Sequence, residues 1–386
     1  MASIYGNSIR ISIFGQSHSE AVGVVIDGLP PGESIDTERL QAFLERRAPG
    51  RNEYSTQRRE PDVPEFLSGL IGGATCGAPV CAVIRNMDVL GPGADTAGGS
   101  NGDGLDKTGK GGNRGDIMRP GHADYTARVR YGGHNDTRSG GHLSGRLTAP
   151  LCVAGGLCLQ ILERAGIEIA AHIQDIGGIP DTAFDPVNVC ATTLRKVRTA
   201  GYPVISEKSG EKMREAIEAA RQDGDSLGGV IECAAIGVPA GLGDPMFDGV
   251  ENRIASIVFG VPAVRGIEFG NGFAAAQLRG SSNNDAFYMD GGAVRTRTNN
   301  HGGILGGMTS GMPIIFRVAI KPTPSIAREQ ESVRIPAAQG RQPVGGGEGA
   351  SLSVRGRNDP CIVPRAVPCI EAAAAIALLD MMAETK

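Results

Sequence analysis

The stretch LTAPLCVAGGLCLQIL, residues 147–162, is apolar around its whole circumference. A helix with that pattern is buried on every side, unlike an amphipathic surface helix. The stretch AVPCIEAAAAIALLDMM, residues 366–382, predicts a second helix with almost no polar positions. Alternating or β-branched runs typical of strands occupy residues 9–14, 22–26, 80–84, 230–236 and 314–320. Buried helices among many short strands favour an α+β fold in which helices are sandwiched between sheets. No linker or short repeat divides the chain, so we expect a single domain over residues 1–386.

The composition is that of a globular chain with an unusual glycine content. Of the 386 residues, 40% are hydrophobic, and 58 are glycines, about twice ordinary usage. The formal net charge of −4 argues against a general nucleic-acid binder. Because the cysteines lack a C-x-x-C spacing and the histidines lack an H-x-x-x-H pair, we expect neither disulfides nor a metal site. No signal peptide or transmembrane span is visible, which favours a cytoplasmic protein without a membrane partner.

Three further segments have a clear local pattern. Asp36 or Thr37 can cap a helix with an apolar face that includes Leu40 and Leu44. Residues 209–221 predict an amphipathic helix. Residues 91–115 are rich in glycine and lack an apolar period, so they predict a long loop inserted in the domain.

Arginines are unevenly distributed. Five lie between residues 46 and 59, and five more between residues 119 and 146. Taken alone, such runs indicate a solvated charged face.

Two short motifs suggest nucleotide binding but are incomplete. GLDKTGK, residues 104–110, is followed by glycine where a phosphate-binding P-loop needs serine or threonine. GNGFAA, residues 270–275, fits a loose dinucleotide fingerprint, but the chain lacks the alternating βαβ units of a Rossmann domain. An NAD-dependent oxidoreductase is therefore retained only as an alternative.

Several blocks, in the right order over nearly the whole chain, resemble the chorismate synthase family. The signature blocks are GQSHS (15–19), GVVIDGLPPG (23–32), RPGHADYT (119–126), SGR (144–146), GRNDPC (356–361) and RAVP (365–368). Between them, TQRREPD (56–62), GVPAGLG (237–243), NHGGILGG (300–307) and KPT (321–323) are similar to the same family.

The resemblance implies a β-α-β sandwich with apolar helices packed between antiparallel sheets, assembled as a homotetramer. It implies a lyase that converts 5-enolpyruvylshikimate 3-phosphate to chorismate and phosphate, the last step of the shikimate pathway. The cofactor implied is reduced FMN, although substrate and product are at the same redox level, and NADPH is a candidate reductant. The substrate carries two carboxylates and a phosphate, which guanidinium forks bind bidentately.

The resemblance also assigns residues. The implied catalytic groups are His18, which protonates phosphate, His122, which protonates flavin, and Asp359, which serves as a base. The implied flavin contacts are Ser144, Ala263, Gly306, Lys321, Thr323, Ser325 and Arg357, with Arg47 at the nicotinamide or substrate entrance. The implied substrate-binding residues are Arg47, Arg119, Arg138 and Arg146.

The chain departs from the family pattern at several positions. The replacements are Gln16 for an acid, Ser19 for glycine, His142-Leu143 for an Arg-Ser pair, Gly145 for alanine, Pro262 for asparagine, Asn358 for histidine and Glu53 for a basic residue. These changes bear on flavin affinity and on NADPH-linked reduction. A second alternative is therefore a paralogue that binds flavin or ligand without turnover, although His18, His122 and Asp359 are intact.

Overall fold

The computed structural model describes residues 3–50, 60–87, 116–335, 347–354 and 358–384. The predicted loop 91–115, the near P-loop 104–110, Glu53 and Arg357 lie outside the described residues.

The first sheet contains five antiparallel strands in the order β1-β2-β3-β7-β4. Its strands are β1 Ile4–Tyr5, β2 Arg10–Gly15, β3 Ala21–Asp27, β4 Pro64–Ser68 and β7 Val80–Arg85. The hairpin between β2 and β3 carries Ser17 and His18, as the sequence predicts.

The second sheet is also five-stranded and antiparallel, in the order β11-β16-β10-β8-β9. Its strands are β8 Glu168–Ile176, β9 Ile179–Pro180, β10 Gly229–Ile236, β11 Val264–Phe269 and β16 Ile314–Ile320. Because β11 pairs only with antiparallel β16 and leads into a short 3-10 helix, GNGFAA lacks the βαβ setting that a dinucleotide fingerprint requires.

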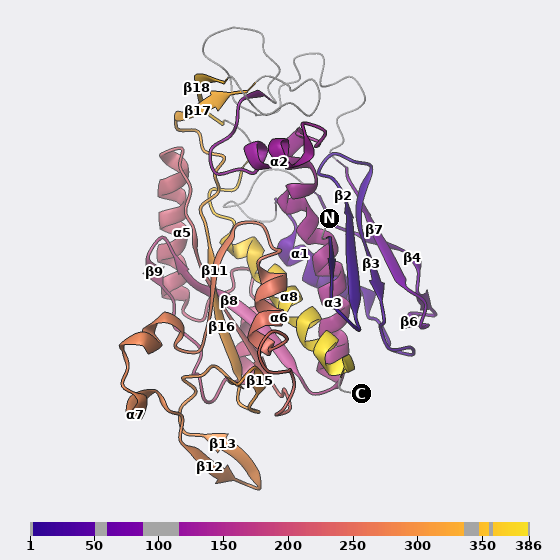
Figure 1. Ribbon diagram of the computed structural model, residues 1–386, viewed down its shortest axis with the longest axis vertical. Helices are drawn as coiled ribbons and strands as arrows, with labels where there is room; N and C mark the ends of the chain where they lie inside the picture. Colours follow the sequence, from indigo (N-terminus) through magenta and orange to yellow (C-terminus); the bar gives the residue numbers. More distant parts are fainter. Residues whose placement is uncertain (1–2, 51–59, 88–115, 336–346, 355–357, 385–386) are drawn as a thin grey trace.

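Two apolar helices, α3 Thr148–Arg164 and α8 Val363–Glu384, lie between the sheets (Figure 1). Helix α3 packs on β3 and β7 of the first sheet, and α8 packs on β8 and β10 of the second. The helices meet closely, since a Cβ added at Gly155 would lie 2.3 Å from the Cα of Ala372. One core of buried hydrophobic residues is continuous across both sheets and these helices. The predicted α+β sandwich is confirmed.

Helix α1, Thr37–Arg47, contacts α3 and α8 at the same layer. Its N-cap is Asp36, whose Oδ1 accepts a hydrogen bond from the backbone N–H of Arg39 at 2.9 Å. Leu40 and Leu44 are buried, as predicted. The last two residues of the helix are Arg46 and Arg47, and Arg47 is buried.

The remaining helices are α2 Asp124–Tyr131, α4 Ala191–Thr199, α5 Glu207–Gln222, α6 Val250–Val258, α7 Gly280–Asn283, and the 3-10 helices η2 Arg138–Leu143, η3 Gly145–Leu147 and η4 Gly272–Gln277. Two-stranded sheets are formed by β5 Leu70–Ile71 with β6 Ala74–Thr75, β12 Phe287–Asp290 with β13 Ala293–Thr296, β14 Ile304–Leu305 with β15 Met308–Thr309, and β17 Gln330–Arg334 with β18 Glu348–Leu352. The β12–β13 hairpin extends away from the two large sheets (Figure 1).

Two helical segments, Arg138–Arg164 and Val363–Glu384, are long and apolar enough to cross a membrane by length and composition. In each, 89% of the apolar window is buried inside the protein. Burial between two sheets accounts for that apolar character and argues against a membrane-spanning role.

Candidate active site

A wide cleft of about 1730 Å³ opens among the loops near the N-terminal ends of helices α3 and α8. Its walls come from the end of β2, the loop before α2, the η2–η3 segment, the start of β11, the segment after β16 and the start of α8. Both sheets and the helix layer therefore contribute residues to one site.

Ten of the residues that the sequence assigns to a site line this cleft. They are Arg47, Arg119, His122, Ser144, Arg146, Ala263, Lys321, Thr323, Ser325 and Asp359. Residues more than 300 positions apart in the chain thus meet in one cavity.

Three other assigned residues do not line it. His18 follows Ser17, which does, and the Nδ1 atom of His18 is buried without a hydrogen-bond partner among the described residues. Arg138 pairs with Asp136 at 2.9 and 3.0 Å, and its side chain is 38% exposed. Gly306 lies in the turn between β14 and β15, outside the cleft lining of this chain.

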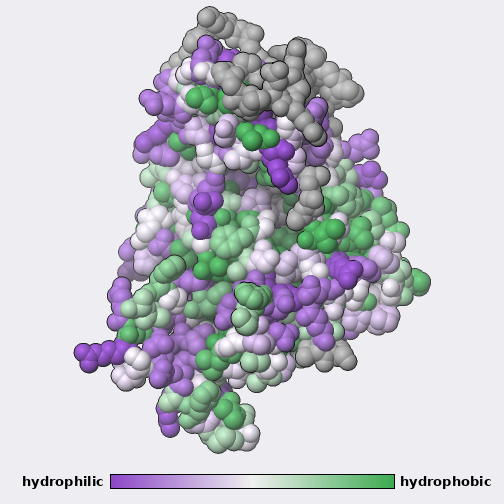
Figure 2. Space-filling view, in the orientation of Figure 1, coloured by the Kyte–Doolittle hydropathy of each residue, from purple (hydrophilic) through white to green (hydrophobic). Residues whose placement is uncertain are grey.

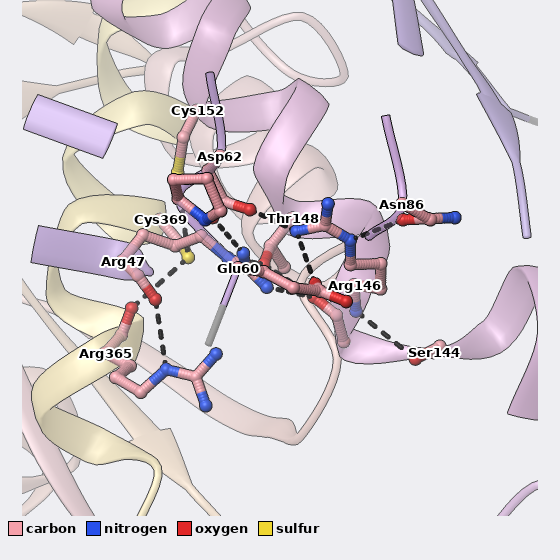
Figure 3. A network of polar contacts seen from close by, with 12 residues as sticks. Arg47, Glu60, Asp62, Asn86, Ser144, Arg146, Thr148, Cys152, Arg365 and Cys369 are labelled. Carbon is pink, nitrogen blue, oxygen red and sulfur yellow. Dashed lines mark hydrogen bonds and ion pairs between the residues drawn. The ribbon is translucent and has the colours of Figure 1, made fainter. Parts of the chain in front are cut away.

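A buried ion-pair network lies at the base of the cleft (Figure 3). The carboxylate of Asp62 accepts hydrogen bonds from Arg47 through one oxygen and from Arg146 through the other. Glu60 lies 3.0 Å from the same Arg146 nitrogen, Nη1. Burial alone would raise the pKa of Asp62, but the two guanidinium groups hold it below its ordinary value. Burial also opposes the charge of Arg47, whose pKa is nevertheless raised because Asp62 is adjacent.

The start of α8 adds a second ion pair. Arg365 donates to Asp359 and, through Nε, to the backbone carbonyl of Arg47 at 3.0 Å. The Asp359 carboxylate is therefore held at the cleft beside the network around Arg47.

His122 also lines the cleft, from the loop before α2. Its Nε2 lies 2.8 Å from the hydroxyl of Ser325. The guanidinium of Arg119 donates two hydrogen bonds, of 2.7 and 2.9 Å, to the carboxylate of Asp124. Burial, and then the positive charge of Arg119, lower the pKa of His122 to about 4. The imidazole is therefore neutral near pH 7 and can accept a proton only when its surroundings become more negative.

The segments that flank β11 and β16 of the second sheet form another wall of the cleft. Ala263 has a positive φ of 74°, which is uncommon for a residue other than glycine, and its carbonyl accepts the N–H of Lys321 at 3.0 Å. Lys321 donates from Nζ to the carbonyl of Gly121. The Thr323 hydroxyl is buried and has no partner among the described residues, so it is a hydrogen-bonding group for a ligand to satisfy.

Glu60, Asp62, Asn86 and Arg365 are site residues to which the sequence analysis gave no role. The available signal was the block TQRREPD, residues 56–62, whose acidic residues follow an arginine-rich run. Arginines that lie in a buried site need carboxylates to compensate their charge. Within the described parts of the chain, no group of three His, Cys, Asp or Glu residues could hold a metal ion.

Comparisons with known proteins identify the family of the chain. Residues 9–383 match the family described as chorismate synthase. The chain belongs to the chorismate synthase family. A chorismate synthase of Korarchaeum cryptofilum is 42% identical over 381 residues, covering 98% of this chain and 96% of that protein. One of Thermococcus kodakarensis is 43% identical over 375 residues, covering 97% and 96%.

A solved chorismate synthase structure has the same fold, with a TM-score of 0.74 and 26% sequence identity. The match covers 98% of this chain and 93% of the other. The chain is therefore an enzyme, a lyase of the chorismate synthase family, in agreement with the prediction from its sequence blocks.

Proposed function

We propose that the cleft eliminates phosphate from 5-enolpyruvylshikimate 3-phosphate to give chorismate, and that residues 1–386 form one catalytic domain. The observation that carries this proposal is the convergence of Arg47, Arg119 and Arg146 with His122 and Asp359 in one cavity. A substrate with two carboxylates and a phosphate needs several cationic donors, and guanidinium groups supply them in bidentate geometry.

The proton transfers are assigned to three side chains. His18 protonates the departing phosphate, because its Nδ1 is buried, has no partner among the described residues and interacts electrostatically with Asp136 at the cleft. Asp359 takes up the proton lost from the ring, with Arg365 fixing its position. His122 takes up a second ring proton once anions fill the cleft, so that both Nδ1 and Nε2 are protonated and it can act as an acid. General acid and base groups of this kind contribute about 10²- to 10⁴-fold each.

The residues on the second-sheet wall fit reduced FMN. Lys321 supplies a cation, Thr323 an unsatisfied hydroxyl, and Ser325 a hydroxyl beside His122. Ser144 and Ala263 complete that contact set from neighbouring segments, and Gly306 and Arg357 remain assigned by family resemblance alone. When bound, reduced FMN supplies an electron-rich ring that assists the elimination without net redox change. NADPH is the reductant we expect if the enzyme reduces its own flavin.

A homotetramer in the cytoplasm is part of the same proposal. Large hydrophobic side chains are exposed on the segment from Met246 to Met308, including Phe247, Phe273 and Phe287. Figure 2 displays hydrophobic side chains on the projecting β12–β13 hairpin, to which Phe287 belongs. Exposed apolar patches of this kind mark protein interfaces.

An anaerobic assay with the substrate and chemically reduced FMN tests the activity, with chorismate absorbance and phosphate release as readouts. We expect His18→Ala and His122→Ala to lower turnover by about 10²- to 10⁴-fold while the fold is retained. Arg221→Ala, a change of an exposed arginine remote from the cleft, is the matched control and should leave turnover unchanged. A wild-type protein that binds substrate and flavin without turnover would instead be the paralogue.

A further inference from the structure

Asp62 combines two unusual properties. It is only 1% exposed, and its backbone φ of 51° lies in the left-handed region that residues other than glycine rarely adopt. Such a conformation persists when the surroundings require it, and it is concentrated at functional sites. Asp62 lies two residues before the start of β4.

The strained backbone brings one carboxylate between two guanidinium groups. Oδ2 accepts from Nη1 of Arg47, and Oδ1 accepts from Nη1 of Arg146. Arg47 uses its other nitrogens as well, because Nε donates to Thr148 at 3.1 Å and Nη2 donates to the carbonyl of Gly145 at 3.4 Å. Each nitrogen of Arg47 therefore has a partner inside the protein.

Arg146 differs from Arg47 in one nitrogen. Its Nε donates to Oδ1 of Asn86 at 2.9 Å, and its Nη1 contacts both Asp62 and Glu60. Its Nη2 is buried and has no hydrogen-bond partner among the described residues. The whole residue is 5% exposed, yet it lines the cleft. An unsatisfied, buried cationic donor costs free energy, and an anion bound in the cleft would remove that cost.

We propose that Asp62 is a positioning residue that aligns Arg146, so that Nη2 donates its hydrogen bonds to a carboxylate or phosphate oxygen of the substrate. This inference rests on the proposed function. Asp62 and Asn86 fix two edges of the planar guanidinium, which leaves the third nitrogen in a single direction. Burial, and the positive charge of nearby Arg47, lower the pKa of Arg146, which indicates an incompletely compensated cation at this point.

The first experiment replaces the charge of Asp62 while keeping its shape. Asp62→Asn retains the side-chain size and the tolerance of positive φ that Asp and Asn share. We expect the dissociation constant of 5-enolpyruvylshikimate 3-phosphate, measured by calorimetry, to rise tenfold or more. In the anaerobic assay, KM should rise more than kcat falls, because the residue acts on binding through Arg146.

The matched control is Asp380→Asn. Asp380 is fully buried, pairs with Arg253 and accepts backbone N–H groups of residues 7–9, but neither Asp380 nor Arg253 lines the cleft. Both variants should lower the thermal midpoint, and only Asp62→Asn should weaken substrate binding. An equal rise in the dissociation constant for both variants would mean that Asp62 has a structural role alone, and the inference would be abandoned.

A double-mutant cycle with Arg146→Gln tests whether Asp62 acts through Arg146. In the Arg146→Gln background, Asp62→Asn should change the dissociation constant by less than twofold. Effects of the two substitutions that multiply independently would contradict the proposal. If Asp62→Asn does not fold, Asp62→Glu keeps the charge but displaces the carboxylate that contacts Arg146, and an unchanged dissociation constant in that variant would overturn the inference.

Failure of the proposed function gives a different result. A wild-type protein that does not bind the substrate would contradict the function itself. A wild-type protein that binds it, together with an Asp62→Asn variant that binds equally well, would contradict only the positioning role.

Discussion

Burial and nearby positive charges keep the imidazole of His122 neutral in the free protein. Burial and Arg119 lower its pKa to about 4, and Lys321 acts in the same direction. An anionic substrate or flavin would oppose these charges, so we expect the pKa of His122 to rise when the cleft is filled. NMR titration of the imidazole in the free and ligand-saturated protein measures the change. A pKa near 6.5 that is the same in both states would show that the charges around His122 have been misjudged.

The sequence identified ten residues of the cleft but not how they pair. Four arginines were predicted to bind substrate anions; Arg47, Arg119 and Arg146 line the cleft, whereas Arg138 does not. The structure adds that each already contacts a carboxylate of the protein. Asp62 is separated from its partners by 15 and 84 positions, so no local spacing could reveal the contacts. Charge balance could have indicated that such partners exist, but not which residues they are.

The close contact between helices α3 and α8 depends on the absence of a side chain at Gly155. A Cβ at Gly155 would lie 2.2 Å from the Cβ and 2.3 Å from the Cα of Ala372, whereas at Gly156 it would meet the movable Cδ1 of Leu40 at 2.4 Å. We expect Gly155→Ala to destabilise the protein by about 1–3 kcal/mol, the usual effect of overpacking. Gly156→Ala should cost less, because Leu40 can rotate and alanine favours the helix by about 1 kcal/mol.

Urea unfolding of the two alanine variants measures this difference. Equal stability of both variants would mean that the helices can separate without cost, contrary to the close backbone contact.

A cross-strand triad links β8 and β10 in the second sheet. His172 is fully buried, with Nε2 at 3.0 Å from Glu232 and Nδ1 at 3.2 Å from Asp181. Burial alone would lower the pKa of His172, but the two carboxylates raise it above 6.5. The protonated form is thus favoured in the folded state, and its stabilisation is complete below the unfolded pKa. It is lost as the pH rises through the folded pKa.

We therefore expect the free energy of unfolding to decrease as the pH is raised above 6.5, and to decrease less in His172→Gln. Urea unfolding across this pH range checks the sign. A wild-type stability that increases over the same range, relative to the variant, would contradict a raised pKa.

Hydrophobic pattern predicted the elements that are buried or strictly amphipathic. The two apolar helices and the strands β2, β3, β7, β10 and β16 were all identified from sequence. Strand β8 and helix α6 were missed. Strand β8 has the sequence EIAAHIQDI, in which alanines and a buried histidine weaken the alternation, and its polar centre is stabilised only by residues of other segments.

At the scale of the molecule, the cleft joins parts that fold around different sheets. Arg47 comes from α1 and Arg146 from η3, whereas the opposing residues proposed to hold flavin flank β11 and follow β16. A ligand bound at one wall therefore presents its own charge and hydrogen-bonding groups to the residues and ligand at the other wall. The apolar helices allowed the two-sheet architecture to be predicted. The contact between these loops could not be predicted, because they are far apart in the sequence and only the folded chain brings them together.

His142 occupies a position where the family resemblance implies an arginine, and its side chain is an imidazole that hydrogen-bonds within the protein. The imidazole contacts the carbonyl of Gly15 and the hydroxyl of Ser3, each at 2.8 Å, and lines the cleft. The loss of one charged hydrogen bond costs about 1.5–3 kcal/mol, or about one to two decades in affinity. We therefore expect oxidised FMN to bind weakly alone and at least tenfold more tightly when substrate is present.

Calorimetry of FMN binding with and without substrate measures this coupling, and linkage requires substrate affinity to rise by the same factor when FMN is present. His142→Arg should tighten FMN binding in the absence of substrate, since it restores a cation at the same wall. His142→Gln, which keeps a polar side chain without adding charge, is the control and should not tighten it. The opposite outcome is that the wild type binds FMN tightly without substrate, with the same affinity as His142→Arg. That result would mean that flavin binding does not depend on this part of the cleft, because the added charge would have no effect on the binding free energy.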